Sequence, residues 1–429
     1  MRFALWLLAI FAAAVGVALF ATRSTGTVTL FWPPYRIDLS LNLVLLLLTA
    51  LFVLFYVALR AFSALVNLPA QAKAWRLNQR QSAMHAQLRD AMALLLSGRF
   101  ARAKRQALQA NQHALSLSDE SASRQHGLEV QSMALLIAAE AAQSLQDTPE
   151  RERLVQAALD VPLPKSALHF KEGTVLRSAR WTLDENDPHT SLQRLGTLSQ
   201  GAQRRTLALR LKLRASQQAR HLSQALETAR LLAKHGGFSG HVAQSIVRSL
   251  AVSSLNEAHD TDQITRAWGQ LTDAERAQTE VATHAAARLI NLSADESQAQ
   301  DLCERARAWM EPLWQRYPQL TEAEQIRVVR TLEASFAKGD GEVDPAWLQK
   351  IETAQRQLPH DLLLQYLAGM ACYYRQLWGK AQQLLAATAP RLKDAALQRS
   401  AYRSLAQLAE QRGDDAAALA AWKQAARGA

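Results

Sequence analysis

Two long runs of apolar residues, joined by a short polar turn, open the chain. The first run extends from Phe3 to Ala21 and the second from Leu39 to Leu59, and neither contains a charged side chain. An α-helix rises about 1.5 Å per residue, so each run is long enough to cross a hydrocarbon core of about 30 Å. The pattern predicts two transmembrane helices that form a hairpin over residues 1–66.

The distribution of basic residues predicts the orientation of this hairpin. Arg23 and Arg36 are the only basic residues in the turn, whereas lysine and arginine become frequent from Arg60 onward. By the positive-inside bias, the N-terminus and the long C-terminal part lie in the cytoplasm. A cleaved signal peptide is the alternative for the first run. That run is longer than the usual apolar region, however, and Leu19 stands where a cleavage site needs a small residue.

The turn between the two runs has a pattern of its own. Thr, Val and Phe alternate before Pro33-Pro34, which predicts a short extended piece followed by a turn. Trp32 and Tyr35 are aromatic residues of the kind enriched at membrane interfaces. The segment is too short to form a domain, so it serves as the connection between the two predicted spans.

After the proline at position 69, the pattern becomes that of a basic amphipathic helix. Lys73, Arg76 and Arg80 recur at spacings of three and four, so they share one face, and Trp75 lies beside them. These four residues are candidate lipid contacts, because anionic headgroups attract nearby Lys and Arg by about 1 kcal/mol each. A solvated linker helix, whose charges only stop translocation, is the alternative.

The remainder of the chain has the composition of packed helices and a weak internal repeat. Small residues recur at offsets that let two antiparallel helices approach closely, and large residues fill the gap to the next pair. Gly369 and Ala406 occupy the same place 37 residues apart, close to the period of about 34 residues in tetratricopeptide repeats. The frame predicts an all-α chain with an α-solenoid of degenerate repeats. Four segments fit it, with Gly98, Phe100, Ala103, Ala107 and Ala110; Leu209, Ser216, Leu222, Ala225, Ala229 and Leu232; Gly369, Cys372, Trp378, Ala381 and Leu385; and Tyr402, Leu405, Ala406, Ala409, Gly413, Ala418, Trp422 and Ala425.

Prolines and glycines in polar stretches divide this helical part. Pro162, Pro164 and Pro188 interrupt one region, and two glycines with Pro345 interrupt another. Residues 67–160 are therefore expected to hold the basic juxtamembrane helix and the first repeats. Residues 161–336 form a central helical region, and residues 337–429 hold the C-terminal repeats.

Several of these features together resemble the HemY family. They are the N-terminal hairpin, the turn VTLFWPPYRIDLSL, the basic helix that opens onto SGRFARAKRQ, and the late run LWGKA. The resemblance covers nearly the full length, and it implies a bacterial inner-membrane protein with tetratricopeptide repeats, associated with late haem (protoporphyrin) biosynthesis. An unrelated flavin-dependent oxidase carries the same name. This chain lacks that enzyme's GxGxxG fingerprint, so its chemistry is not implied.

The sequence contains no recognisable catalytic or metal-binding constellation. The eleven histidines follow no HExxH or other ligand spacing, and GGFSGH around Ser239 lacks both the final glycine and the preceding strand of a nucleophile elbow. Cys303 and Cys372 are the only cysteines, which fits a reducing compartment. We expect no catalytic residue, no metal and no cofactor.

Charge indicates the kind of partner. The net charge of +11 suits a domain held near anionic lipid, and no nucleic-acid recognition module accompanies it. The densest basic cluster surrounds Arg210 and Arg214, which are four residues apart and share a helix face. This face is a candidate docking site for an acidic protein segment or a carboxylate-rich porphyrin precursor. A solvated face that supports solubility is the alternative.

An aromatic stripe is the second candidate binding surface. In the repeat frame, Tyr366, Met370, Tyr373 and Tyr374 face the concave side of the solenoid, where they would suit a partner peptide or a flat macrocycle. Packing between repeats is the alternative interpretation of such a stripe. A porphyrin ligated by Tyr373, Cys372 or His360 is a further possibility, although no haem-attachment signature accompanies these residues.

These observations predict a membrane-anchored, protein-binding solenoid. The resemblance adds that its partners are enzymes of late haem synthesis, which it would organise or regulate. Three alternatives stay open: an adaptor for membrane-protein assembly or quality control, a porphyrin or haem carrier, and a cryptic enzyme.

Overall fold

The structure is a computed structural model, and it describes residues 26–118, 124–292, 296–338 and 344–427. The predicted first span, Phe3–Ala21, lies outside these residues. The chain divides into two compact units, Met1–Phe170 and Lys171–Ala429. The finer boundaries expected after residues 66, 160 and 336 stay predictions.

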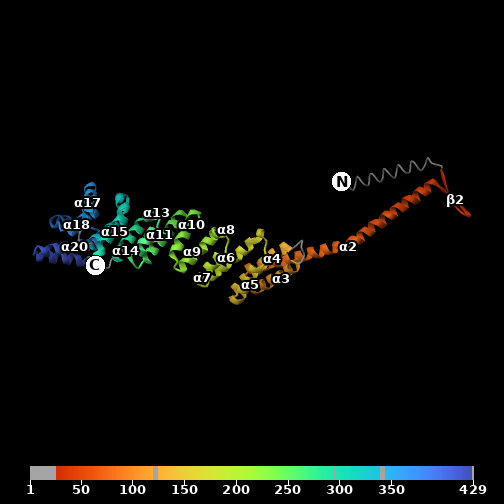
Figure 1. Cartoon of the computed structure of the whole chain (residues 1–429), viewed down its shortest axis with the longest axis horizontal. Coiled ribbons are helices and arrows are strands. Elements are labelled where there is room, and N and C mark those ends of the chain that lie inside the picture. The colour runs from red at the N-terminus through yellow and green to blue at the C-terminus, as the bar shows by residue number, and fades with distance from the viewer. Residues whose placement is uncertain (1–25, 119–123, 293–295, 339–343, 428–429) are drawn as a thin grey trace. The chain divides into compact units, whose positions relative to one another are not determined.

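An antiparallel hairpin opens the described part of the first unit (Figure 1). Strand β1 (Thr27–Trp32) pairs with β2 (Tyr35–Ser40), and Pro33-Pro34 form the turn, joined by a cis peptide bond. The extended piece and the turn predicted from the sequence are therefore confirmed. Trp32 and Tyr35 flank the turn, and each is 71% exposed.

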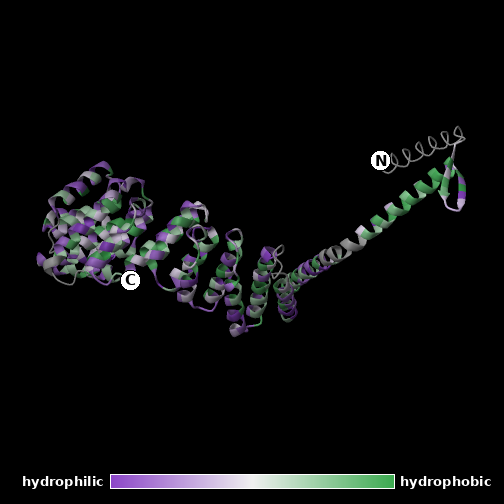
Figure 2. Ribbon diagram, turned by 45° about the vertical axis from the view of Figure 1, so that its right-hand side comes forward, coloured by the Kyte–Doolittle hydropathy of each residue, from purple (hydrophilic) through white to green (hydrophobic). Residues whose placement is uncertain are grey.

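Helix α2 (Leu41–Leu96) follows directly and continues for 56 residues. Ser40 caps it, because its hydroxyl accepts a hydrogen bond from the backbone N–H of Leu43. Its first part, Leu41–Ser63, is the only segment among the described residues that is long and apolar enough to cross a membrane. Figure 2 shows this apolar part giving way to a polar part within one helix. The second predicted span thus has a matching helix, and the first stays a prediction.

The sequence pattern predicts that a new helix begins after Pro69, but no helix ends there. Pro69 lies inside α2, so one helix carries both the apolar segment and the basic segment that follows it. A proline removes one backbone donor from a helix and usually kinks or ends it. Here the helical residues on both sides continue the helix across the proline.

Three more helices complete the first unit: α3 (Phe100–Ser118), α4 (Arg124–Ser144) and α5 (Thr148–Asp160). Each packs on the one before it. On α3 the contacts are made by Ala103, Ala107, Ala110 and Ala114, all with no exposed surface. Side chains this small let neighbouring helices approach closely, as the repeat frame around Gly98 predicts.

Among the described residues, the same turn joins the two helices of seven hairpins. One residue adopts a positive φ, and the next residue donates its N–H to the carbonyl five positions earlier, which is the hydrogen bond of a Schellman motif. Because this turn reverses the chain within a few residues, the two helices of each hairpin pack antiparallel. The positive-φ residues are Gly98, Gln146, Asn186, Arg220, Gly236, Gln376 and Gly413.

The second unit is built almost entirely from such helices. A short 3₁₀ turn, η1 (Lys165–Ala167), comes before it, and η2 (Tyr317–Gln319) and η3 (Ala389–Arg391) interrupt it. Its helices are α6 (Leu168–Asp184), α7 (Pro188–Gly196), α8 (Gln200–Gln203), α9 (Thr206–Gln218), α10 (Leu222–Lys234), α11 (Gly240–Asn256), α12 (Thr261–Gly269), α13 (Asp273–Arg276), α14 (Thr279–Leu292), α15 (Glu296–Gln315), α16 (Glu322–Lys338), α17 (Pro345–Gln357), α18 (Leu362–Tyr374), α19 (Trp378–Thr388), α20 (Ala395–Gln411) and α21 (Asp415–Arg427).

Helices α11, α14, α16 and α18 form one continuous layer of this unit. Each packs on the next, while α15 packs on α14 and α16, and α17 and α19 pack on α18. One apolar core extends through the packed helices from Leu209 to Ala401. The helical hairpins expected around Leu209, Gly369 and Ala406 are confirmed as α9 with α10, α18 with α19, and α20 with α21.

Candidate functional site

Arg210 and Arg214, the predicted centre of a basic docking surface, are both exposed on α9. The Nη2 of Arg210 donates to the carbonyl oxygen of Gly237 over 2.7 Å, and its guanidinium lies 6.0 Å from the ring of Phe238. The Nη1 of Arg214 lies 3.1 Å from the Oδ1 of Asp184. Each arginine therefore ties α9 to a neighbouring segment. Partner binding by this pair stays a prediction.

The aromatic stripe on α18 does not form a common exposed surface. Tyr366 and Met370 are buried in the core, so the prediction that they face an open concave surface was wrong. The reason is that α16, α17 and α19 all cover α18, which makes packing between repeats the correct interpretation for these two residues. Tyr373 and Tyr374 are partly buried, and the hydroxyl of Tyr373 donates to the Oε1 of Gln407 over 2.7 Å.

The residues considered as porphyrin ligands lie in different environments. Cys372 is fully buried against Ala381 and Leu408, and burial raises the pKa of its thiol. His360 is exposed after α17. A thiol enclosed in this way offers no open coordination position to a macrocycle. Within the described ranges, no group of three or more His, Cys, Asp or Glu residues is placed to hold a metal ion.

The predicted lipid contacts lie on the polar part of α2. The side chains of Trp75, Arg76 and Arg80 are exposed, and Lys73 belongs to the same helix, although its side chain lies outside the described part. A straight helix places Trp75 about 18 Å beyond Ser63, whereas each headgroup layer is only about 5–8 Å thick. Lipid contact by these four residues stays a prediction, and it requires the helix to bend or lie against the surface.

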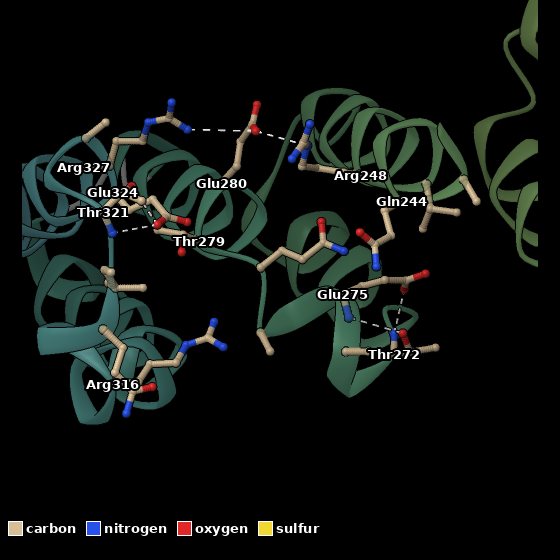
Figure 3. A pocket seen from close by; sticks show the side chains of 18 of the residues that line it. Gln244, Arg248, Thr272, Glu275, Thr279, Glu280, Arg316, Thr321, Glu324 and Arg327 are labelled. Atoms are coloured by element: carbon tan, nitrogen blue, oxygen red, sulfur yellow. Dashed lines mark hydrogen bonds and ion pairs between the residues drawn. The ribbon is translucent and has the colours of Figure 1, made fainter. Parts of the chain in front are cut away.

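A wide concavity lies elsewhere, in the second unit. It is a groove of about 890 Å³ between α10, α11, the N-terminal ends of α14 and α16, and the short helix α13. Its lining includes small apolar side chains, among them Ala243, Val247, Ala277 and Ala323. Charged and amide side chains also line it (Figure 3). We refer to this concavity as the α11–α16 groove.

A buried ion pair fixes one wall of the groove. The guanidinium of Arg230 on α10 donates to both carboxylate oxygens of Glu275, over 2.8 and 2.6 Å, and the Glu275 side chain is only 6% exposed. Thr272 and Glu275 also form a capping box at the start of α13. Burial raises the pKa of Glu275, but the hydrogen bonds from Arg230 and Thr272 outweigh it and leave the pKa below its usual value. The two charges of this wall are therefore satisfied within the fold.

A second set of charges crosses the layer of helices. The Oε2 of Glu280 on α14 lies 3.2 Å from the Nε of Arg248 on α11 and 3.9 Å from the Nη1 of Arg327 on α16. Figure 3 shows the carboxylate between the two guanidinium groups. All three side chains are about half exposed. Two cations therefore share one anion, which leaves an excess positive charge on this row.

Arg316 contributes the third side of the groove. It precedes η2 and extends into the groove in Figure 3. Among the described residues, its guanidinium has no hydrogen-bond or ion-pair partner, and its Nε is shielded from solvent without one. Glu324, an acid of the same lining, accepts hydrogen bonds from the backbone and hydroxyl of Thr321, which lower its pKa, and the charge of Arg316 lowers it further.

The sequence contains no local signal for this groove. Arg248, Glu280, Arg316 and Arg327 are far apart along the chain and belong to no common motif. Only the packing of α11 on α14 and of α14 on α16 brings these side chains together.

The fold and the groove define a class of protein: a chain of tetratricopeptide-like helical hairpins that begins with an apolar, membrane-compatible helix. A comparison with known families matches residues 26–146 to the family described as "HemY protein N-terminus". Over these residues the match supports the resemblance to the HemY family seen in the sequence. The matched range contains the β1–β2 hairpin, α2, α3 and α4.

Comparisons with curated proteins and solved structures give no further evidence about the family or the function. No curated protein matches the chain. Among solved structures, "Structure of Naa15/Naa10 bound to HypK-THB" is 14% identical with a TM-score of 0.25, over 76% of this chain and 56% of that one. "Crystal Structure of P58(IPK) TPR Domain at 2.5 A" is 14% identical with a TM-score of 0.21, over 77% and 99%. "Circular tandem repeat protein with novel repeat topology and enhanced subunit contact surfaces" is 12% identical with a TM-score of 0.24, over 82% and 96%. At these scores the likenesses carry no argument about function.

Proposed function

We propose that the protein is a membrane-anchored scaffold, rather than an enzyme, that binds other proteins at the cytoplasmic face of a bacterial inner membrane. The observation that carries this proposal is the continuity of α2. Its first part is the apolar segment Leu41–Ser63, and its last part packs on α3 as the first helix of the repeats. One helix therefore connects the membrane anchor to the protein-binding array without a flexible linker.

Anchoring has a direct thermodynamic effect on partner binding. A partner that is itself in or on the membrane meets the repeats at a raised effective concentration, so a modest contact gives stable association. Two spans with both ends of the chain in the cytoplasm fit the arginine distribution around the turn. The excess of basic residues also favours a position close to anionic lipid.

The match of residues 26–146 to the HemY N-terminus supports a particular set of partners. The family is associated with late haem synthesis, so the proposed partners are enzymes that act on porphyrin intermediates. The scaffold would place these enzymes next to one another at the membrane. Nothing in the α11–α16 groove favours a porphyrin carrier, because its lining contains no His, Cys, Tyr or Met to ligate iron.

Crosslinking in living cells tests the proposal. Full-length protein is crosslinked in its own membrane, purified under denaturing conditions and analysed by mass spectrometry. A chimera that carries residues 1–66 fused to a fluorescent protein, expressed at the same level, is the matched control. Enrichment of porphyrin-pathway enzymes by the full chain over the chimera is the expected result. Enrichment of membrane-assembly factors alone would contradict the haem role and support an assembly adaptor.

A further inference from the structure

The α11–α16 groove has unused hydrogen-bonding capacity. Arg316 has no side-chain partner among the described residues, and the same holds for the side-chain amides of Gln244, Gln278 and Gln319, which also line the groove. An amide group offers both a donor and an acceptor. This combination suits an extended main chain, which exposes both N–H and C=O groups along its length.

The charges of the groove favour an anionic occupant whose charge is spread out. Arg248 and Arg327 share Glu280, and Arg316 has no ion-pair partner among the described residues, so several guanidinium groups can accept further carboxylates. Glu275, Glu280 and Glu324 stand between these cations along the lining. A compact dianion such as phosphate would meet these acids at close range. Single carboxylates spaced along a peptide can each contact an arginine without lying close to these glutamates.

The volume and the uncharged part of the lining also favour an extended segment. Ala243, Ala277 and Ala323 leave about 890 Å³ open, within the range of binding sites for small ligands or short segments. The lining contains no aromatic ring. Flat ligands and sugars, which rely on stacking against aromatic faces, therefore have no such surface here.

We propose that the α11–α16 groove binds an extended acidic segment of a partner protein, with Arg316 as its principal anchor and Arg248 and Arg327 as additional carboxylate contacts. The inference depends on the proposed scaffold function for the existence of such a partner. It adds the chemical class of the segment and the place where it binds.

Peptide binding by the full-length protein tests the groove directly. The protein is placed in nanodiscs of phosphatidylcholine, which is neutral overall and does not compete for the arginines. The probes are two fluorescein-labelled peptides of equal length, one alternating glutamate with alanine and the other alternating glutamine with alanine. Fluorescence anisotropy is expected to show binding of the glutamate peptide only. Equal affinity for the two peptides, or no binding of either, would overturn the proposal.

Three variants locate the binding site. Arg316→Glu is expected to weaken the glutamate peptide by about tenfold or more, because a charge-assisted contact becomes a repulsion. Ala323→Trp fills the groove from an exposed position and is expected to abolish binding without loss of helical structure. Arg266→Glu is the matched control, because Arg266 is exposed on α12 outside the groove. Among the described residues, its side chain bonds only to a carbonyl of its own helix. Binding that survives both groove variants would overturn the proposal.

A crosslinking arm separates this inference from the scaffold function. In-cell crosslinking is repeated with Arg316→Glu and Arg266→Glu in the full-length protein. Partners lost only from Arg316→Glu support the groove as their docking site. Partners captured equally by both variants would overturn the groove assignment and leave the scaffold function intact. Absence of any partner, together with selective peptide binding, would contradict the scaffold function alone.

Discussion

Gly369 on α18 lies directly against Leu385 on α19. A Cβ atom built on the glycine would be 2.9 Å from both the Cγ and the Cδ2 of Leu385, and 3.3 Å from the Cβ of Leu384. The two helices of this hairpin therefore approach so closely that no side chain fits between them. The small and bulky places assigned to Gly369 and Leu385 in the repeat frame correspond to this contact.

Replacing Gly369 by alanine should destabilise the second unit by about 1–3 kcal/mol, because overpacking forces α18 and α19 apart. The thermal unfolding midpoint of the full-length protein, followed by circular dichroism, measures the effect. Combining Gly369→Ala with Leu385→Ala should cost less than the sum of the two single changes, since the truncated leucine leaves room for the new methyl group.

Gly173→Ala is the matched control for this substitution. Gly173 lies inside α6, and a Cβ there would meet no heavy atom within 4 Å. Alanine should leave stability unchanged or raise it by up to about 1 kcal/mol through helix propensity. If both substitutions lowered the unfolding midpoint equally, close packing at Gly369 would not be the cause.

The Arg230–Glu275 pair should contribute strongly to stability at neutral pH. Arg230→Gln leaves a buried carboxylate without its cation, at an expected cost of about 2–4 kcal/mol, toward the lower end for buried pairs because Arg230 is 28% exposed. Arg153→Gln is the control, because the Arg153–Glu150 pair on α5 is largely exposed and should cost about 0.5 kcal/mol or less.

The same pair should make stability depend on pH. The pKa of Glu275 in the folded protein lies below its unfolded value of about 4.5. The stabilisation is therefore complete above that unfolded value and is lost as the pH falls through the folded value. The difference in unfolding midpoint between the wild type and Arg230→Gln should shrink below about pH 4.5. A difference that stays constant from pH 7 to pH 3 would contradict this assignment.

Removing the acid between two arginines should strengthen peptide binding. Glu280→Gln frees Arg248 and Arg327 from their shared carboxylate and keeps the shape of the side chain. Affinity for the glutamate peptide should rise by about threefold to tenfold, measured by anisotropy. Stability should change by less than about 1 kcal/mol, because all three side chains are half exposed. Unchanged or weaker binding would show that this row does not contact the peptide.

The two cysteines should resist modification in the folded protein. Cys303 and Cys372 have no exposed surface, and burial raises the pKa of both thiols. Thiol reagents at neutral pH should therefore label neither residue until denaturant is added. Ala323→Cys, on the exposed start of α16, supplies a rapidly labelled control. Fast labelling of Cys372 without denaturant would show that it is accessible and would restore it as a candidate ligand.

The repeat frame found the hairpins that turn at Gly98, Arg220, Gln376 and Gly413, and it missed those that turn at Gln146 and Asn186. Gly98 and Gly413 mark their turns clearly, whereas Gln146 and Asn186 adopt the same positive φ without an obvious signal. In both missed turns the next residue, Asp147 or Asp187, caps the following helix. A polar residue followed by a capping aspartate was therefore the sequence signal that could have indicated these turns. The turn geometry comes from the packing of the two helices, which a local propensity does not reveal.

The candidate sites were harder to predict than the fold. Periodicity placed Tyr366 and Met370 on one helix face, but it could not show that α16 covers that face. Arg210 and Arg214 stood out by their density, yet each already has a partner within the fold. Arg316, by contrast, looks unremarkable in the sequence. Its significance depends on the absence of a partner among the described residues, which only the folded arrangement reveals.

The uninterrupted course of α2 has a consequence for the direction in which the first repeats face. Each residue of an α-helix turns the chain by about 100°, so inserting a single residue between Ser63 and Leu77 would rotate α3 and α4 about the anchor by that angle. An insertion of about 18 residues completes five helical turns, so α3 and α4 face their original direction again and lie about 27 Å farther from the apolar segment. The length of α2 thus sets the direction in which α3 and α4 face as well as their distance from the membrane. Both quantities affect whether a partner fixed in the same bilayer can reach these helices.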